Sequence, residues 1–157
     1  MPFLTLAFAV LLLVGSLAQG LGVSNRQIHP VRDIVADPAA LAWLAYKAAV
    51  QLYVERNPGF TGSVPLAQLG LPQNGAGLAA ADNLVTRNGG TTQVVTWMAL
   101  SGISIDSIRR LAAGDQSIGI SRGTTWETPT YGNMGSLPVV VPQDDIVSCV
   151  SFTGSGF

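Results

Sequence analysis

The longest regular pattern in the chain is a helical one that starts at Asp37. Aspartate is a favoured N-cap residue, and Pro38 suits the first helical position because its missing N–H would be unpaired there anyway. Residues 39–56 contain no glycine or proline, and an Asn-Pro-Gly sequence from Asn57 onward stops the run. We therefore predict a helix over Asp37–Asn57.

This predicted helix carries more apolar side chains than one buried face requires. Its main apolar stripe consists of Leu41, Leu44, Ala48 and Leu52. A second group widens the apolar surface: Trp43, Tyr46, Val50 and Tyr53. We predict that the helix lies on a sheet and that the second group is a protein-interaction surface, since aromatic side chains bury large areas at low entropic cost. The alternative is that all four residues belong to the core of the domain.

Further along the chain the period of the pattern changes to two. Leu84–Arg87 and Thr91–Met98 flank Asn88-Gly89-Gly90, and Asn-Gly is a favoured hairpin turn because both residues accept a positive φ. We predict a hairpin here and a single helical turn before it, at Pro65–Leu69.

The remaining pattern predicts one more helix and several short strands. Ser104 is the expected N-cap of the second helix, and Gly114 is its expected stop. The expected strands are Ser117–Arg122, Thr124–Glu127, Leu137–Val141 and Ile146–Phe152. Pro138 and Pro142 favour an edge or brief strand at Leu137–Val141. The fold class is therefore α+β, with residues 37–157 as one domain in which a long helix packs on a mainly antiparallel sheet.

The N-terminal segment Pro2–Val23 contains no charged side chain. A helix of this length can cross a bilayer core of ~30 Å, so residues 1–23 are predicted to be a transmembrane anchor. The alternatives are a signal segment cleaved after Ala18 and an ordinary core helix. Residues 24–36 are predicted to be a linker, because regular structure is disfavoured in this part of the chain by Gly20, Gly22, Ser24, Asn25 and Pro30. Arg26 and Arg32 would favour a cytoplasmic domain, yet N-terminal apolar segments commonly lead a chain outward, so we expect the domain in the periplasm.

Composition excludes some functions and leaves little chemistry for others. The net charge is −1 and the eight basic residues are scattered, so nucleic-acid binding is excluded. There is one histidine, His29, in the linker, and one cysteine, Cys149, in a predicted strand, where we expect an inert small hydrophobe. Asp144-Asp145 reads as a solvated turn. We predict no catalytic or metal-ligating residues and no cofactor, hence no enzyme.

Two stretches resemble a known family. They are Leu44–Pro72, LAYKAAVQLYVERNPGFTGSVPLAQLGLP, and Gly123–Val147, GTTWETPTYGNMGSLPVVVPQDDIV. With the apolar N-terminal segment, they are similar to the PilM family of conjugative thin-pilus (type IVb) systems. That pattern has a glycine where this chain has Asp144.

The resemblance implies a bacterial inner-membrane protein of the type IV pilus assembly apparatus, with one membrane span and other pilus-assembly proteins as partners. It offers no catalytic residues. The alternatives are a pilin-like structural subunit, for which Glu, Lys and Arg are missing from residues 1–25, and an exported binding domain unrelated to pili.

Overall fold

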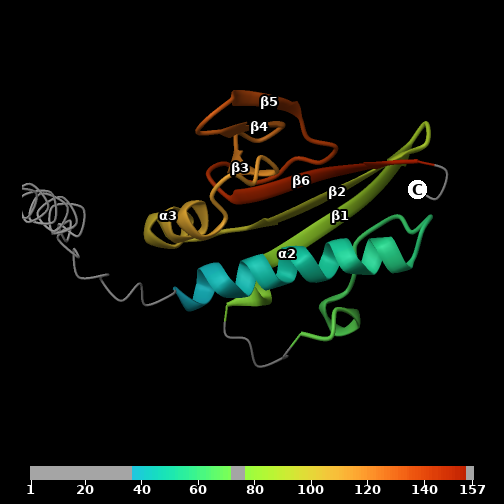
Figure 1. Ribbon diagram of the computed structural model, residues 1–157, viewed down its shortest axis with the longest axis horizontal. Coiled ribbons are helices and arrows are strands. Elements are labelled where there is room, and N and C mark those ends of the chain that lie inside the picture. The colour runs from blue at the N-terminus through green and yellow to red at the C-terminus, as the bar shows by residue number, and fades with distance from the viewer. Residues whose placement is uncertain (1–36, 72–76, 155–157) are drawn as a thin grey trace, which may run out of the picture. The chain divides into compact units, whose positions relative to one another are not determined.

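The computed structural model describes residues 37–71 and 77–154 of the 157-residue chain (Figure 1). The predicted anchor or signal segment 1–23, the linker 24–36 and His29 lie outside the described residues. The described residues belong to one compact unit that contains two α-helices and a six-stranded antiparallel sheet. None of the helices in this part of the chain is long and apolar enough to cross a membrane.

The first of these helices, α2 (Pro38–Arg56), confirms the predicted long helix. The side chain of Asp37 accepts a hydrogen bond of 3.0 Å from the backbone N–H of Ala39, so Asp37 is the N-cap as expected. Asn57 ends the helix, and its backbone N–H donates to the carbonyl of Tyr53. Local sequence signals at both ends therefore set the length of α2.

The sheet has the strand order β1-β2-β6-β3-β4-β5, with every neighbouring pair antiparallel. Its strands are β1 (Ala81–Asn88), β2 (Thr91–Met98), β3 (Ile118–Ser121), β4 (Thr125–Thr128), β5 (Gly132–Ser136) and β6 (Ile146–Thr153). The last strand in sequence is inserted between β2 and β3, so the C-terminal strand joins the hairpin to the rest of the sheet (Figure 1).

The predicted hairpin is present, with a shifted turn and a longer first strand. The turn residues are Gly89 and Gly90, with φ of 56° and 84°, while Asn88 pairs with Thr91 inside the ladder. Either Asn-Gly or Gly-Gly can supply two positive φ angles, and the strand register decides between them. Strand β1 also begins at Ala81, three residues before the expected start, because β2 extends far enough to pair with it.

Each face of the sheet has its own apolar cluster. On one face α2 packs along β1 and β2, with the second helix α3 (Gly102–Leu111) beside it (Figure 1). This cluster includes Trp43, Tyr46, Val50, Val94, Ile108 and Ile146. The other face is covered by a smaller cluster of Val95, Trp126, Leu137, Val141 and Val147. The domain is thus a helical layer, a sheet and a partial cover from the segment after β5.

A buried amide connects the helix to the edge of the sheet. Asn83 in β1 is 3% exposed, and its Nδ2 donates to the hydroxyl of Tyr46 at 2.6 Å and to the carbonyl of Val64 at 3.0 Å. Its Oδ1 accepts from the backbone N–H of Val64 at 2.7 Å. A buried amide whose donors and acceptor are paired in this way fixes the helix, the loop and the strand relative to one another.

The helix α3 corrects the predicted start of the second helix. Its N-cap is Ser101, whose side chain accepts from the N–H of Ser104 at 3.2 Å, and Ser104 itself lies inside the helix and is buried. Both serines are favoured N-cap residues. Glycine is unfavourable inside a helix, so the sequence alone favours a helix that starts after Gly102. The helix ends at Leu111 with Ala112 as its C-cap, and Gly114, with a φ of 91°, lies two residues further on.

The strand predicted at Leu137–Val141 is wrong, and the structure has β5 just before it instead. Residues 137–141 form a covering segment in which Leu137 and Val141 are buried under the second face. Pro138 has no N–H for a ladder. Strand β5 pairs with β4 across a bulge, although glycines at 132 and 135 lowered its apparent strand propensity.

Gly119 in β3 is a position that only glycine fits. A Cβ there would lie 2.3 Å from the carbonyl oxygen of Glu127 and 2.8 Å from the indole ring of Trp126. The ring of Trp126 therefore packs directly over the backbone of β3, which a larger residue at position 119 would prevent.

The turn before β6 has a positive φ at Asp144, the position where the family-like sequence pattern has a glycine. Asp144 has a φ of 67° and is the one non-glycine residue with positive φ among the described residues. Aspartate tolerates this conformation better than most residues. Its carboxylate accepts a 2.8 Å hydrogen bond from Arg122, which holds the turn against β3.

Candidate functional site

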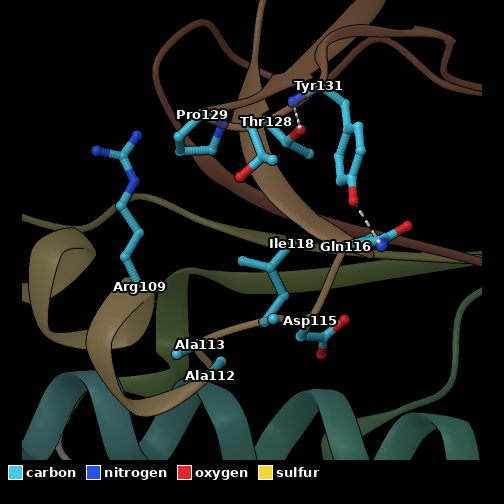
Figure 2. A pocket seen from close by; sticks show the side chains of 11 residues that line it. Arg109, Ala112, Ala113, Asp115, Gln116, Ile118, Thr128, Pro129 and Tyr131 are labelled. Carbon is cyan, nitrogen blue, oxygen red and sulfur yellow. Dashed lines mark hydrogen bonds between the residues drawn. The ribbon is translucent and has the colours of Figure 1, made fainter.

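A depression on the described surface lies between the end of α3 and the β4–β5 turn, with a volume of about 430 Å³ (Figure 2). Arg109 rises on one side, Thr128, Pro129 and Tyr131 form the other, and Ile118 lies between them. Asp115 and Gln116, from the α3–β3 connection, also line the depression.

Asp115 is fixed from two directions. One carboxylate oxygen accepts a hydrogen bond from Lys47 of α2, and the other accepts from the N–H and hydroxyl of Ser117 at 2.9 and 2.7 Å. The side chain of Lys47 is only 11% exposed, whereas that of Asp115 is 35% exposed. Burial by itself raises the pKa of Asp115, but the hydrogen bonds from Lys47 and Ser117 outweigh it and the net pKa is lowered. The carboxylate is therefore ionised and anchors the connection to α2.

The opposite wall is held by a second set of bonds. The hydroxyl of Tyr131 accepts a hydrogen bond of 2.9 Å from the Gln116 amide, and the Tyr131 N–H donates to Thr128 Oγ1 at 3.1 Å. Tyr131 is 56% exposed, so its ring is presented to solvent across the depression from Arg109 (Figure 2). One exposed cation, an aromatic hydroxyl and an apolar floor are suited to contact a polypeptide segment.

The interaction surface predicted on α2 is wrong for most of its residues, because their side chains are buried in the domain. Trp43 and Val50 are 0% exposed and Tyr46 is 2% exposed, all in the apolar cluster beneath α2. Tyr53 is half-buried, with its ring 5.2 Å from that of Phe60 in an edge-to-face contact. Three of the four residues are therefore core, and the exposed apolar positions of α2 include Leu41 and Leu52 from the stripe that we assigned to the sheet.

The residues that could carry chemistry have structural partners. Burial raises the pKa of the Cys149 thiol, and Gln93 Nε2 lies 3.1 Å from its sulfur, so this side chain is a protonated, half-buried thiol. Asp144 and Glu127 both accept from Arg122 on the surface. Within residues 37–71 and 77–154, no group of three or more His, Cys, Asp or Glu side chains could hold a metal ion.

Sequence reasoning missed the depression because its lining has no shared pattern. Arg109 is one of several charged positions on α3, and Asp115 follows a helix stop where polar residues are common. The one available signal was Tyr131, an aromatic residue beside the Thr-Pro and glycine turn of the second family-like stretch. Only the tertiary fold, which places the end of α3 near the β4–β5 turn, brings these residues together.

Comparison with known proteins points to one family. The sequence model of the PilM family matches residues 9–149. The fold is similar to the crystal structure of a protein described as PilM from Escherichia coli B7A, with a TM-score of 0.55 and 17% identity over 80% of this chain and 98% of that chain. A second structure, described as a PilM protein from Pseudomonas aeruginosa 2192, gives a TM-score of 0.36 and 19% identity over 71% and 91% of the two chains. No curated protein matches the sequence significantly.

Proposed function

This chain belongs to the PilM family, and we propose that it is a non-enzymatic, membrane-anchored component of a bacterial type IV pilus assembly apparatus of the conjugative thin-pilus kind. The family match over residues 9–149 is the observation that carries the proposal. The matched range begins in the apolar N-terminal segment and ends in β6, so it includes both of the family-like stretches.

Membrane anchoring is supported by the uncharged segment Pro2–Val23. In this proposal residues 1–23 are a single inner-membrane span, 24–36 a linker, and 37–157 a periplasmic domain. The domain acts by contact with other pilus-assembly proteins, and no cofactor or nucleic acid takes part.

A contact role is supported by what the polar groups of the domain do. Asn83 and the Lys47–Asp115 pair join elements of the fold, and Arg122 holds the turn before β6. The depression beside Asp115, with Arg109 and Tyr131 exposed on its walls, is the surface we assign to a partner protein. An acidic and apolar segment of that partner would complement the cation and the apolar floor.

Deletion of the gene should abolish or strongly reduce surface pili, and the full chain supplied in trans should restore them. Pili are counted by electron microscopy, and sheared pili are then probed for the protein. An assembly component is needed for pili and is missing from the purified fibres. Wild-type piliation of the deletion strain would contradict the proposal, and the protein as a regular component of fibres would favour the pilin-like subunit.

The topology can be tested independently of pili. A periplasmic reporter such as alkaline phosphatase, fused after Phe157, should be active, and the protein should fractionate with the inner membrane. The reason is that Pro2–Val23 is long enough to span and carries no charge. A fluorescent cytoplasmic reporter that is bright at the same position would reverse the orientation. A soluble protein that starts at Gln19 would establish cleavage instead of anchoring.

A further inference from the structure

The outward face of α2 carries a regular apolar stripe that the domain leaves uncovered. Leu41 is 45% exposed and Leu52 is 43% exposed, and Ala45 and Ala48 between them are also exposed. We call these four residues the α2 stripe. The opposite face of the same helix, with Trp43 and Val50, fills the core. The stripe therefore stands apart from the depression beside Asp115 and is not needed to bury the helix.

The α2 stripe reads the same in both directions along the helix. Its spacing is four, three and four residues, with leucine at both ends and alanine at both inner positions. A second copy that approaches in the antiparallel direction would place Leu41 against the partner's Leu52, and Ala45 against the partner's Ala48. Such a two-fold, self-complementary contact is the commonest form of association between identical chains.

The size of the side chains fits close approach at the two-fold axis. Alanine at the two inner positions lets the helix axes come to the short end of the ~8–10 Å range of packed helices, and the flanking leucines fill the space at both ends. The one charged residue between Asp37 and Glu55 is Lys47, which points inward to Asp115. No charged side chain on this face would have to be desolvated over most of the helix.

The charges at the helix ends favour the antiparallel direction. Antiparallel pairing brings the end with Arg56 beside the partner's Asp37, and it puts Glu55 near the partner's helix N-terminus, where the macrodipole favours an anion. Parallel pairing would instead set the two Asp37 carboxylates side by side, and the two Arg56 guanidinium groups likewise. Among the described residues Arg56 makes no ion pair within its own chain.

From these observations we infer that α2 is a self-association surface through which two copies of this chain pair antiparallel, with the axis between Ala45 and Ala48. A single helix pair is smaller than the ~800 Å² per partner of a stable interface. The dimer is accordingly weak in dilute solution and is best detected by trapping. This inference goes beyond the proposed pilus role and does not depend on it.

Cysteine cross-linking of the full chain in detergent tests the pairing and its direction. In a Cys149→Ser background, chains with Leu41→Cys and chains with Leu52→Cys, tagged to differ in size, are oxidised alone and mixed. Antiparallel pairing predicts a disulfide-linked heterodimer in the mixture. It predicts little homodimer from either chain alone, since two copies of position 41 would be ~16 Å apart along the axis, beyond the ~7 Å limit for a disulfide.

A charge introduced into the stripe should prevent the pairing, and the same change outside the stripe is the matched control. Ala48→Arg, added to both chains, should cause loss of the heterodimer while the melting temperature stays near that of the parent, because position 48 is exposed. Ile103→Arg on α3, at a residue 76% exposed outside the stripe, should leave the heterodimer intact. Equal homodimers and heterodimers, or no cross-link in any mixture, would overturn the inference. A heterodimer that survives Ala48→Arg would overturn it as well.

Discussion

Replacing Trp43 with alanine should lower the free energy of unfolding by about 3–5 kcal/mol, the range for a large aromatic side chain lost from a packed core. Trp43 is 0% exposed between α2 and the sheet, so the substitution leaves a cavity beneath the helix. Urea unfolding of the full chain in detergent, followed by circular dichroism, gives the change. The melting temperature should fall by roughly 10 °C or more.

Two control variants separate packing from surface effects. Trp43→Phe keeps most of the volume and removes an indole N–H that has no hydrogen-bond partner among the described residues, so it should cost much less. Leu52→Ala, on the exposed side of the same helix, should also cost little. If Trp43→Ala kept its stability and lost piliation, Trp43 would be an interface residue and the packing described above would be wrong.

Removal of the Asp115 carboxylate should cost about 3 kcal/mol, close to the range for a broken buried ion pair. In Asp115→Ala the Lys47 ammonium, on a side chain only 11% exposed, loses its partner and cannot regain full hydration. Lys47→Met should cost less, because Asp115 is partly exposed and keeps its hydrogen bonds to Ser117. The double variant should lie below Asp115→Ala in cost, since it leaves no unpaired charge. Urea unfolding gives all three values.

The same pair predicts how stability depends on pH. The pKa of Asp115 is lower in the folded protein than its ordinary value of 3.8. Its stabilisation is therefore fully present above about pH 4 and is lost as the pH falls through the lower, folded value. Melting temperatures measured between pH 6 and pH 3 should fall more steeply for the wild type than for Asp115→Ala. Parallel curves would show that the ionised Asp115 carboxylate does not stabilise the fold. A smaller loss of unfolding free energy for Asp115→Ala than for Lys47→Met would contradict the argument from an unpaired Lys47 ammonium.

Local signals made several elements predictable. The ends of α2 follow from Asp37 and Asn57, and the hairpin follows from a glycine-rich turn between two runs of period two. Strand β6 follows from its apolar, β-branched composition. These features depend on residues near one another in the chain, where capping, turn geometry and side-chain period act directly.

Other elements depended on partners far along the chain. Strand β5 is rich in glycine and exists because β4 pairs with it, whereas residues 137–141 look like a strand and serve as a cover for Trp126 and Val147. The helix α3 begins after Ser101, although the local sequence favoured a start at Ser104. In each case tertiary contacts outweighed local propensity.

The sequence by itself determined the family, the α+β class and the existence of the long apolar helix, because these rest on patterns repeated over many residues. Only the tertiary structure decided which side of α2 is inside. Trp43, Tyr46 and Val50 form one stripe and Leu41, Ala45, Ala48 and Leu52 form another, both apolar, so periodicity gives no preference between them. The choice follows from shape and pairing: the aromatic side fills the volume over β1 and β2, Tyr46 reaches Asn83, and Lys47 reaches Asp115. The smaller leucine and alanine side faces outward.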